Sequence, residues 1–232
     1  MKRNEAVAMG VSQIKPIIVP EPPENGGTVT RLSWQKKDPH RCSVFLDDSF
    51  AFGLHVDVVS AHGLRKGVVL SLDDCLALLQ EDVYYRALKR ILSHLAYKPR
   101  TEKELQDRLD RLHVDASTRK QVMEKVRSMH LVHDERYAEE FARGRLRAYG
   151  PRRVVRELIQ KGIPETLAEK TVVACNPHDD PDEHMAHVTE KAWNRYRTES
   201  DPRTRSRKTI GYLVRRGYDV EEIKVALSLI AP

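Results

Sequence analysis

The feature that most constrains this fold is a sequence pattern that recurs three times after residue 100. Leu109, Leu158 and Leu213 are each followed, four residues later, by a residue at the expected end of a helix, and then by an apolar residue. The ending residues are His113, Gly162 and Gly217, and the apolar residues are Val114, Ile163 and Tyr218. Successive copies lie 49 and 55 residues apart. Such a recurrence is typical of tandem helical units that stack to bury a shared apolar ridge.

Helical periodicity surrounds each copy of the pattern. From residue 81 onward, apolar residues recur with the 3.6-residue period of an α-helix, and the sequence predicts nine helices in three triplets. Their ranges are 82–97, 101–112, 116–129, 134–148, 151–161, 164–174, 182–197, 204–216 and 219–229. The expected helix starts are Thr101, Asp134, Pro164 and Asp219, and the expected stops are Gly150, Gly162 and Gly217. The predicted repeats span 81–132, 133–177 and 178–232; the alternative is one irregular helical bundle in which the similarity is accidental.

Two different segments precede the repeats. Residues 31–80 predict a small α+β module, with strands at 42–46 and 50–54 joined by a hairpin turn, a short helix at 56–62 and a strand at 68–70. Residues 1–30 contain four of the twelve prolines and show no period, which predicts a disordered tail. The predicted fold class is therefore mainly α: three tandem three-helix repeats forming an elongated stack, preceded by a small β-containing N-terminal module and the tail.

The central repeat carries a specific resemblance. The stretch HDERYAEEFARGRLRAYGPRRVVRELIQKGI, from His133 to Ile163, strongly resembles the central repeat of the regulatory protein RecX family. The run ALKRILSHLAYKPRTEKELQDRL, from Ala87 to Leu109, matches the first repeat of that family, and the third repeat is more degenerate. VFLDDSFAFGL and LRKGVVLSLDD resemble the short β-containing lead-in of some members. The resemblance covers roughly residues 40–230.

The resemblance implies a function as well as a fold. RecX-like proteins bind the bacterial RecA recombinase and act on its filament on single-stranded DNA, usually inhibiting ATP hydrolysis and strand exchange. It implies a cytoplasmic helical protein with no cofactor. We therefore expect the RecA filament as partner, with single-stranded DNA contacted directly or through the filament, and a monomer. The alternative is a stand-alone DNA-binding helical module without a RecA partner, because Thr101–Leu105 resembles the opening of many helix-turn-helix units.

The net charge of +6 is unevenly distributed. Segment 136–161 holds eight basic and three acidic residues, and segment 195–217 holds eight basic and two acidic residues, so together they carry +11 and the rest of the chain −5. The helical period points Arg153, Arg156, Lys208 and Arg215 away from the apolar faces. The predicted binding ridge for RecA or DNA comprises Arg143, Arg147, Arg152, Arg153, Arg156, Lys161, Arg205, Arg207, Lys208, Arg215 and Arg216. Such a surface suits a polyanion or an acidic protein groove, and charge alone does not separate the two.

Arg145 differs from the ridge residues. It falls at the centre of the apolar face formed by Tyr137, Ala138, Phe141 and Ala142, so we expect its guanidinium to be buried. A buried guanidinium requires a carboxylate or carbonyl partner. We expect a structural ion pair, with Glu157 or Asp134 as the partner.

No motif of the sequence predicts catalysis. The run from His178 to His187 holds three histidines and four carboxylates, but it straddles a break between repeats where acidic helix caps are expected, so we predict no metal there. Asp134, beside His130 and His133, is expected to cap its own helix. Three scattered cysteines and the lack of a phosphate-binding loop predict neither a disulfide framework nor an enzyme. The sequence shows no secretory signal and no apolar run long enough for a membrane span.

Overall fold

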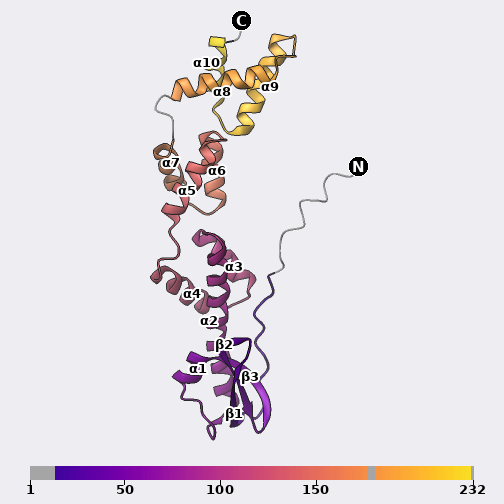
Figure 1. The fold of residues 1–232 in the computed structure, drawn as a ribbon, viewed down its shortest axis with the longest axis vertical. Helices are drawn as coiled ribbons and strands as arrows, with labels where there is room; N and C mark the ends of the chain where they lie inside the picture. Colours follow the sequence, from indigo (N-terminus) through magenta and orange to yellow (C-terminus); the bar gives the residue numbers. More distant parts are fainter. Residues whose placement is uncertain (1–13, 177–180, 231–232) are drawn as a thin grey trace, which may run out of the picture. The chain divides into compact units, whose positions relative to one another are not determined.

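The computed structural model describes residues 14–176 and 181–230, which form two compact units (Figure 1). Unit 1 extends to Lys98 and includes Leu105–Leu131; unit 2 comprises Pro99–Glu104 and the residues from Val132 onward. The described residues contain ten helices and one four-stranded sheet, and the sheet belongs to unit 1. The prediction of a mainly α fold, with three-helix repeats behind a β-containing module, is confirmed.

The sheet is antiparallel, with strand order β3-β2-β1-β4. The strands are β1 (Gly27–Gln35), β2 (Asp38–Leu46), β3 (Ser49–His55) and β4 (Val69–Leu70). In β2, alternate residues Cys42, Val44 and Leu46 face the core, as the period of two requires. Asp47 and Asp48 join β2 to β3 with φ values of 47° and 67°, the left-handed conformation that tight hairpin turns favour. The predicted hairpin is therefore confirmed.

Strand β1 was not predicted, and it corrects the extent of the tail. Residues 27–30, assigned to a disordered tail, form the start of this central strand, where Val29 is buried opposite Leu46. Upstream of β1, Ile17 is also buried, and its main-chain N–H donates to the carbonyl of Leu112 at 2.9 Å. Pairing with β2 and β4, which lie later in the sequence, outweighs the flexibility that the prolines and glycines suggest. Residues 1–13 lie outside the described part of the chain.

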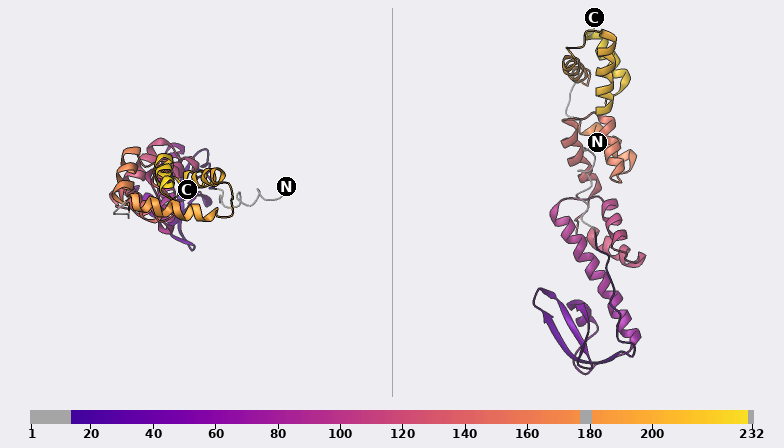
Figure 2. Two further views of the ribbon diagram at one scale, coloured as in Figure 1. Left: turned by 90° about the horizontal axis from the view of Figure 1, so that it is seen from above. Right: turned by 90° about the vertical axis from the view of Figure 1, so that its right-hand side faces the viewer.

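Helices α1 (Val56–Ala61) and α2 (Leu72–Tyr97) complete the N-terminal module. The predicted helix 82–97 is only the second part of α2, which begins ten residues earlier. Ser71 and Asp74 form a capping box at its start, because each side chain bonds the main-chain N–H of the other. The first turns of α2 pack on the sheet core, and the helix continues beyond the sheet (Figure 2).

The remaining helices follow the predicted ranges closely. They are α3 (Glu102–Arg111), α4 (Ala116–Ser128), α5 (Asp134–Leu146), α6 (Pro151–Gln160), α7 (Glu165–Ala174), α8 (Pro181–Arg195), α9 (Pro202–Arg216) and α10 (Val220–Ile230). The three aligned stop residues share one conformation: φ is 57° at His113, 90° at Gly162 and 93° at Gly217. The recurring pattern therefore marks the same left-handed helix end three times.

Repeats two and three have separate hydrophobic cores. Helices α5, α6 and α7 enclose one cluster, which includes Ala138, Leu158 and Val172. Helices α8, α9 and α10 enclose another, which includes Trp193, Leu213 and Ile223. Separate cores favour tandem repeats over one irregular bundle. Trp193 is buried within the second of these cores.

Two predicted helix signals act differently from expectation. Gly150, expected to end a helix, is the N-cap of α6, and α5 ends earlier, at Leu146. Asp134 was expected to cap α5, but it is the first residue of that helix, after His133. Its carboxylate accepts the main-chain N–H of Glu102 at 2.9 Å, so Asp134 caps the start of α3 instead.

Candidate anion-binding surface

The repeats join through the ends of their middle helices. At each of the two junctions, a residue of the predicted binding ridge accepts a hydrogen bond through its main-chain carbonyl. The hydroxyl of Thr101 donates to the carbonyl of Lys161 at 2.7 Å, and the main-chain N–H of Gly150 donates to the carbonyl of Arg216 at 2.8 Å. Lys161 and Arg216 occupy equivalent positions, each just before the left-handed glycine. The start of one middle helix therefore bonds the end of the next in both junctions.

The Lys161 side chain is also committed to its junction. Its ammonium lies 3.2 Å from Glu104 Oε1, and the side chain is partly buried. Burial alone would lower the pKa of Lys161, but hydrogen bonds with Tyr137 and Glu104 outweigh it, so the pKa is raised. Lys161 therefore carries a positive charge that Glu104 already balances.

The predicted partner of Arg145 is present, but the arginine is less buried than expected. Arg145 Nη2 lies 2.6 Å from Glu157 Oε2, while Arg153 Nε donates to the other carboxylate oxygen at 2.9 Å. The Arg145 side chain is 39% exposed, so the expectation of a buried guanidinium is wrong. Burial alone would raise the pKa of Glu157, yet the hydrogen bonds and charges of the two arginines outweigh it and lower the pKa.

Arg153 was expected to point outward, and the structure corrects this placement. Its guanidinium lies 4.0 Å from the centre of the Tyr149 ring and donates to the carbonyl of Arg215 at 3.2 Å. Arg216 also approaches that ring and donates to the carbonyl of Ala148 at 3.0 Å. The helical period alone could not show this, because the bond to Arg215 and both contacts of Arg216 come from the junction with repeat three. Arg153 and Arg216 therefore stabilise the junction between repeats two and three.

Four more ridge residues have partners within the chain. Arg205 donates twice to the carbonyl of Trp193, at 2.9 and 3.1 Å, and lies over its ring. The other pairs are Arg152 with Asp219, Lys208 with Glu199 and Arg143 with Glu139. The last three cations are largely exposed, so these pairs restrain them weakly. Arg205, which is half-buried, is a structural residue.

The remaining ridge residues are the ones best placed to bind a partner. Arg147, Arg156, Arg207 and Arg215 are exposed. The charge of Arg207 acts on Asp201 and helps to lower its pKa, after the larger effect of the hydrogen bonds from Thr204. Arg147, Arg156 and Arg215 have no ion-pair partner among the described residues. They form the exposed arginine set, which offers three uncompensated guanidinium groups.

The described residues offer little for metal or thiol chemistry. Within 14–176 and 181–230, no group of three or more His, Cys, Asp or Glu side chains could hold a metal ion. His178, Asp179 and Asp180, which belong to the run from His178 to His187, lie outside these ranges. Burial raises the pKa of the Cys42 and Cys75 thiols, which makes them poor nucleophiles. None of the described helices has the length and apolar character that crossing a membrane demands.

Comparison with known protein families gives four matches in chain order. The model of the "Regulatory protein RecX N-terminal domain" matches residues 27–71. The models of the first, second and third RecX three-helix domains match residues 87–125, 134–172 and 179–227. The matched β-containing domain includes all of β1, and residues 14–26 fall outside the four matches.

Similar curated proteins agree with these matches, and two solved structures share the fold. "Regulatory protein RecX" of Clostridium acetobutylicum is 31% identical over 205 residues, which cover 88% of this chain and 96% of the relative. The protein of the same description from Clostridium perfringens is 27% identical over 196 residues, covering 84% and 92%. A crystal structure of regulatory protein RecX has a TM-score of 0.69 at 24% identity, covering 87% of this chain and 98% of the other. The crystal structure of RecX from Lactobacillus salivarius has a TM-score of 0.55 at 24% identity, covering 65% and 97%.

Proposed function

The chain belongs to the regulatory protein RecX family, and we propose that it binds the RecA recombinase on single-stranded DNA and inhibits its ATP hydrolysis and strand exchange. In this proposal the protein is a cytoplasmic regulator of DNA repair and recombination. It acts as a monomer, through binding and without chemistry of its own.

The observation that carries the proposal is the exposed arginine set, Arg147, Arg156 and Arg215. These side chains belong to repeats two and three, where the sequence concentrates its positive charge. Exposed guanidinium groups without a carboxylate partner favour phosphates or acidic side chains, and a protein filament on DNA offers both. The partnered cations Arg145, Arg153 and Lys161 stabilise the repeats that present the set.

The test uses the purified full-length chain with RecA, single-stranded DNA and ATP. The unchanged chain should slow ATP hydrolysis at micromolar concentration. The triple variant R147E/R156E/R215E should raise the half-inhibitory concentration roughly ten-fold or more, because three attractive interactions become repulsive. Circular dichroism should show unchanged helix content, since all three side chains are exposed.

A matched control separates this effect from net charge. Lys125, Lys170 and Lys191 are also exposed and lie on α4, α7 and α8. The variant K125E/K170E/K191E changes the net charge equally and should inhibit RecA almost as well as the unchanged chain. If the unchanged chain binds bare DNA tightly but leaves the ATPase rate unaltered, the alternative of a stand-alone DNA-binding module is correct.

A further inference from the structure

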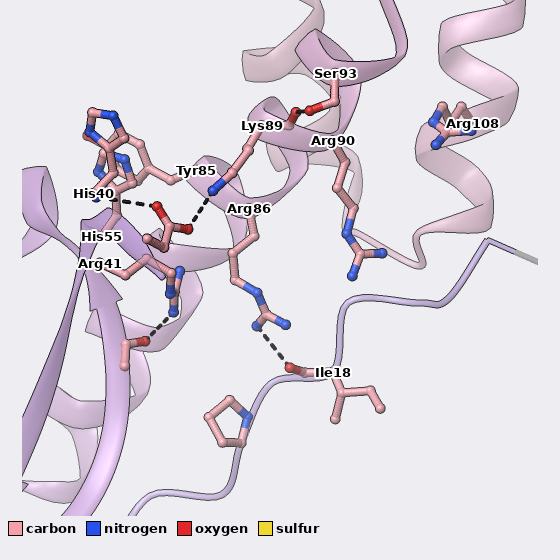
Figure 3. Close-up of a pocket in the computed structure, with 13 residues that line it drawn as sticks. Ile18, His40, Arg41, His55, Tyr85, Arg86, Lys89, Arg90, Ser93 and Arg108 are labelled. Carbon is pink, nitrogen blue, oxygen red and sulfur yellow. Dashed lines mark hydrogen bonds and ion pairs between the residues drawn. The ribbon is translucent and has the colours of Figure 1, made fainter. Parts of the chain in front are cut away.

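A second basic site lies in unit 1, away from the exposed arginine set in the sequence. A pocket of about 630 Å³ opens between β2, β3 and α2 (Figure 3). Residues 15–20, which we call the N-terminal strap, contribute Ile18 and Pro20 to its wall, and α3 contributes Arg108. Five cationic side chains line the pocket: Arg41, Arg86, Lys89, Arg90 and Arg108.

The charge of this pocket is only partly balanced. Asp38 is the one carboxylate among the described lining residues, and it lies 2.5 Å from the ammonium of Lys89. Behind the pocket, the buried carboxylate of Asp82 accepts from Arg41 at 3.0 Å. Each of these two carboxylates is therefore already paired with a different cation.

Arg86 and Arg90 instead meet neutral groups. Arg86 Nη1 donates to the carbonyl of Ile18 at 2.9 Å (Figure 3), and Arg90 donates to the carbonyl of Lys15. These strap carbonyls satisfy hydrogen bonds without cancelling charge. Burial lowers the pKa of Arg86, and the charges of Arg41 and Arg90 lower it further against the opposing effect of Asp82. Because an arginine stays protonated even so, two guanidinium groups, one helical turn apart on α2, keep their full charge.

A row of flat rings forms another part of the same wall. The rings of His55 and Tyr85 are stacked with centroids 4.2 Å apart and planes within 4°. The His40 ring is parallel to that of His55, 6.0 Å from it, and His40 is exposed. The row therefore ends in an exposed ring, on which another planar group can stack.

From this arrangement we propose that the pocket binds single-stranded nucleic acid, with backbone phosphates on Arg86 and Arg90 and a base stacked on His40. Charged groups that track a backbone and rings that stack bases are the two elements of single-strand recognition. An acidic peptide would use the arginines but would leave the ring row unused. Nucleic acid is the partner that accounts for both features.

The first test measures binding of a fluorescein-labelled oligothymidine to the full-length chain by fluorescence anisotropy. The variant R86E/R90E should weaken binding about ten-fold or more and reduce the slope of log affinity against log salt by about 0.7 for each phosphate that is no longer neutralised. The control R111E/K125E alters two exposed cations of the same unit that do not line the pocket, and should retain affinity within about three-fold. If the two double variants behave alike, the pocket is not the site. If R86E/R90E loses helix content, the single variant R90Q replaces it, because glutamine keeps a hydrogen-bond donor and removes the charge. R90Q should still bind oligothymidine more weakly than the control R111E/K125E does.

The second test distinguishes a nucleic-acid site from a plain anion site. The variant H40A should weaken oligothymidine binding about five-fold or more, because the stacking platform is removed. The same variant should bind inorganic polyphosphate as the unchanged chain does. An unchanged affinity of H40A for oligothymidine would refute the stacking interaction and the nucleic-acid assignment. Tighter, arginine-dependent binding of a polyglutamate peptide would point to an acidic protein instead and overturn the proposal.

Both tests are independent of RecA. Repeating them in the R147E/R156E/R215E background removes the exposed arginine set as a competing site, and the effect of R86E/R90E should persist there. If R86E/R90E and H40A bind oligothymidine normally, the pocket proposal is wrong, and the proposed inhibition of RecA by repeats two and three is unaffected. If the chain does not inhibit RecA, the proposed function is wrong, and the oligothymidine tests still decide the pocket proposal.

Discussion

The hydroxyl of Thr101 donates to the main-chain carbonyl of Lys161 at 2.7 Å, and so bonds the start of α3 to the end of α6. Thr101 is completely buried, and its hydroxyl oxygen also accepts the N–H of Glu104 at 3.2 Å, which caps α3. One side chain thus serves both a helix cap and a junction between repeats. At the next junction, the main-chain N–H of Gly150 takes the place of this hydroxyl.

Replacement of Thr101 by valine should therefore lower the free energy of unfolding by about 1–2 kcal/mol, because the volume stays similar while the cap and the junction bond are removed. Urea unfolding followed by circular dichroism measures this. Thr101→Ser keeps the hydroxyl and should lose less stability. Equal losses for the two variants would show that the hydroxyl has no such role.

Gly217→Ala should destabilise repeat three by at least about 1 kcal/mol, because φ is 93° there and a Cβ would lie 2.6 Å from the main-chain nitrogen of Arg153. Gly144 provides the opposite case within α5, since it is exposed and a Cβ would meet no atom within 4 Å. Gly144→Ala should raise stability by about 0.5–1 kcal/mol. Thermal unfolding of the two variants should therefore shift in opposite directions, and a shift of both in the same direction would contradict the assignment.

The helical repeats were predictable because their determinants are local. The apolar period and the stop residues at His113, Gly162 and Gly217 act within a few residues of each helix end. Strand β1 was missed because a register shift between Val29 and Arg31 interrupts the alternation of buried and exposed residues that marks a strand. Its own residues follow a stretch of prolines and glycines that suggests flexibility.

The candidate surface was predictable in composition but not in detail. Counting charges located the basic repeats, and the helical period correctly left Arg156 and Arg215 exposed. The period could not show that Arg153 and Arg216 meet around Tyr149, because that arrangement requires the junction between repeats. The pocket beside Arg86 was missed entirely, since it combines the strap, two strands and α2. No signal within a single segment would have revealed it.

The Glu157 carboxylate should give repeat two an acid-sensitive contribution to stability. Its pKa is lower in the folded protein than its ordinary value near 4.5, so the contribution is present above that value and is lost as the pH falls through the folded-state pKa. Glu157→Gln should therefore cost about 1–2 kcal/mol at neutral pH, reduced by the partial exposure of Arg145. When unfolding is measured at a series of pH values from 7 down to 3, the free energies of unfolding of the unchanged chain and of Glu157→Gln should converge as the pH falls. A cost that stays constant with pH would contradict a charged role.

Salt dependence should separate the exposed arginines from the structural ones. Arg156 and Arg215 are exposed without ion-pair partners among the described residues, so each should release counterions when it meets DNA. Co-sedimentation with the RecA filament, measured over a range of salt concentrations, should show that R156A and R215A each reduce the slope of log affinity against log salt by about 0.7. Arg205 bonds the carbonyl of Trp193, so R205A should leave the slope unchanged and lower the melting temperature instead. A full slope in R156A and R215A would mean that these arginines do not contact DNA, and weaker binding at the same slope would assign them to RecA.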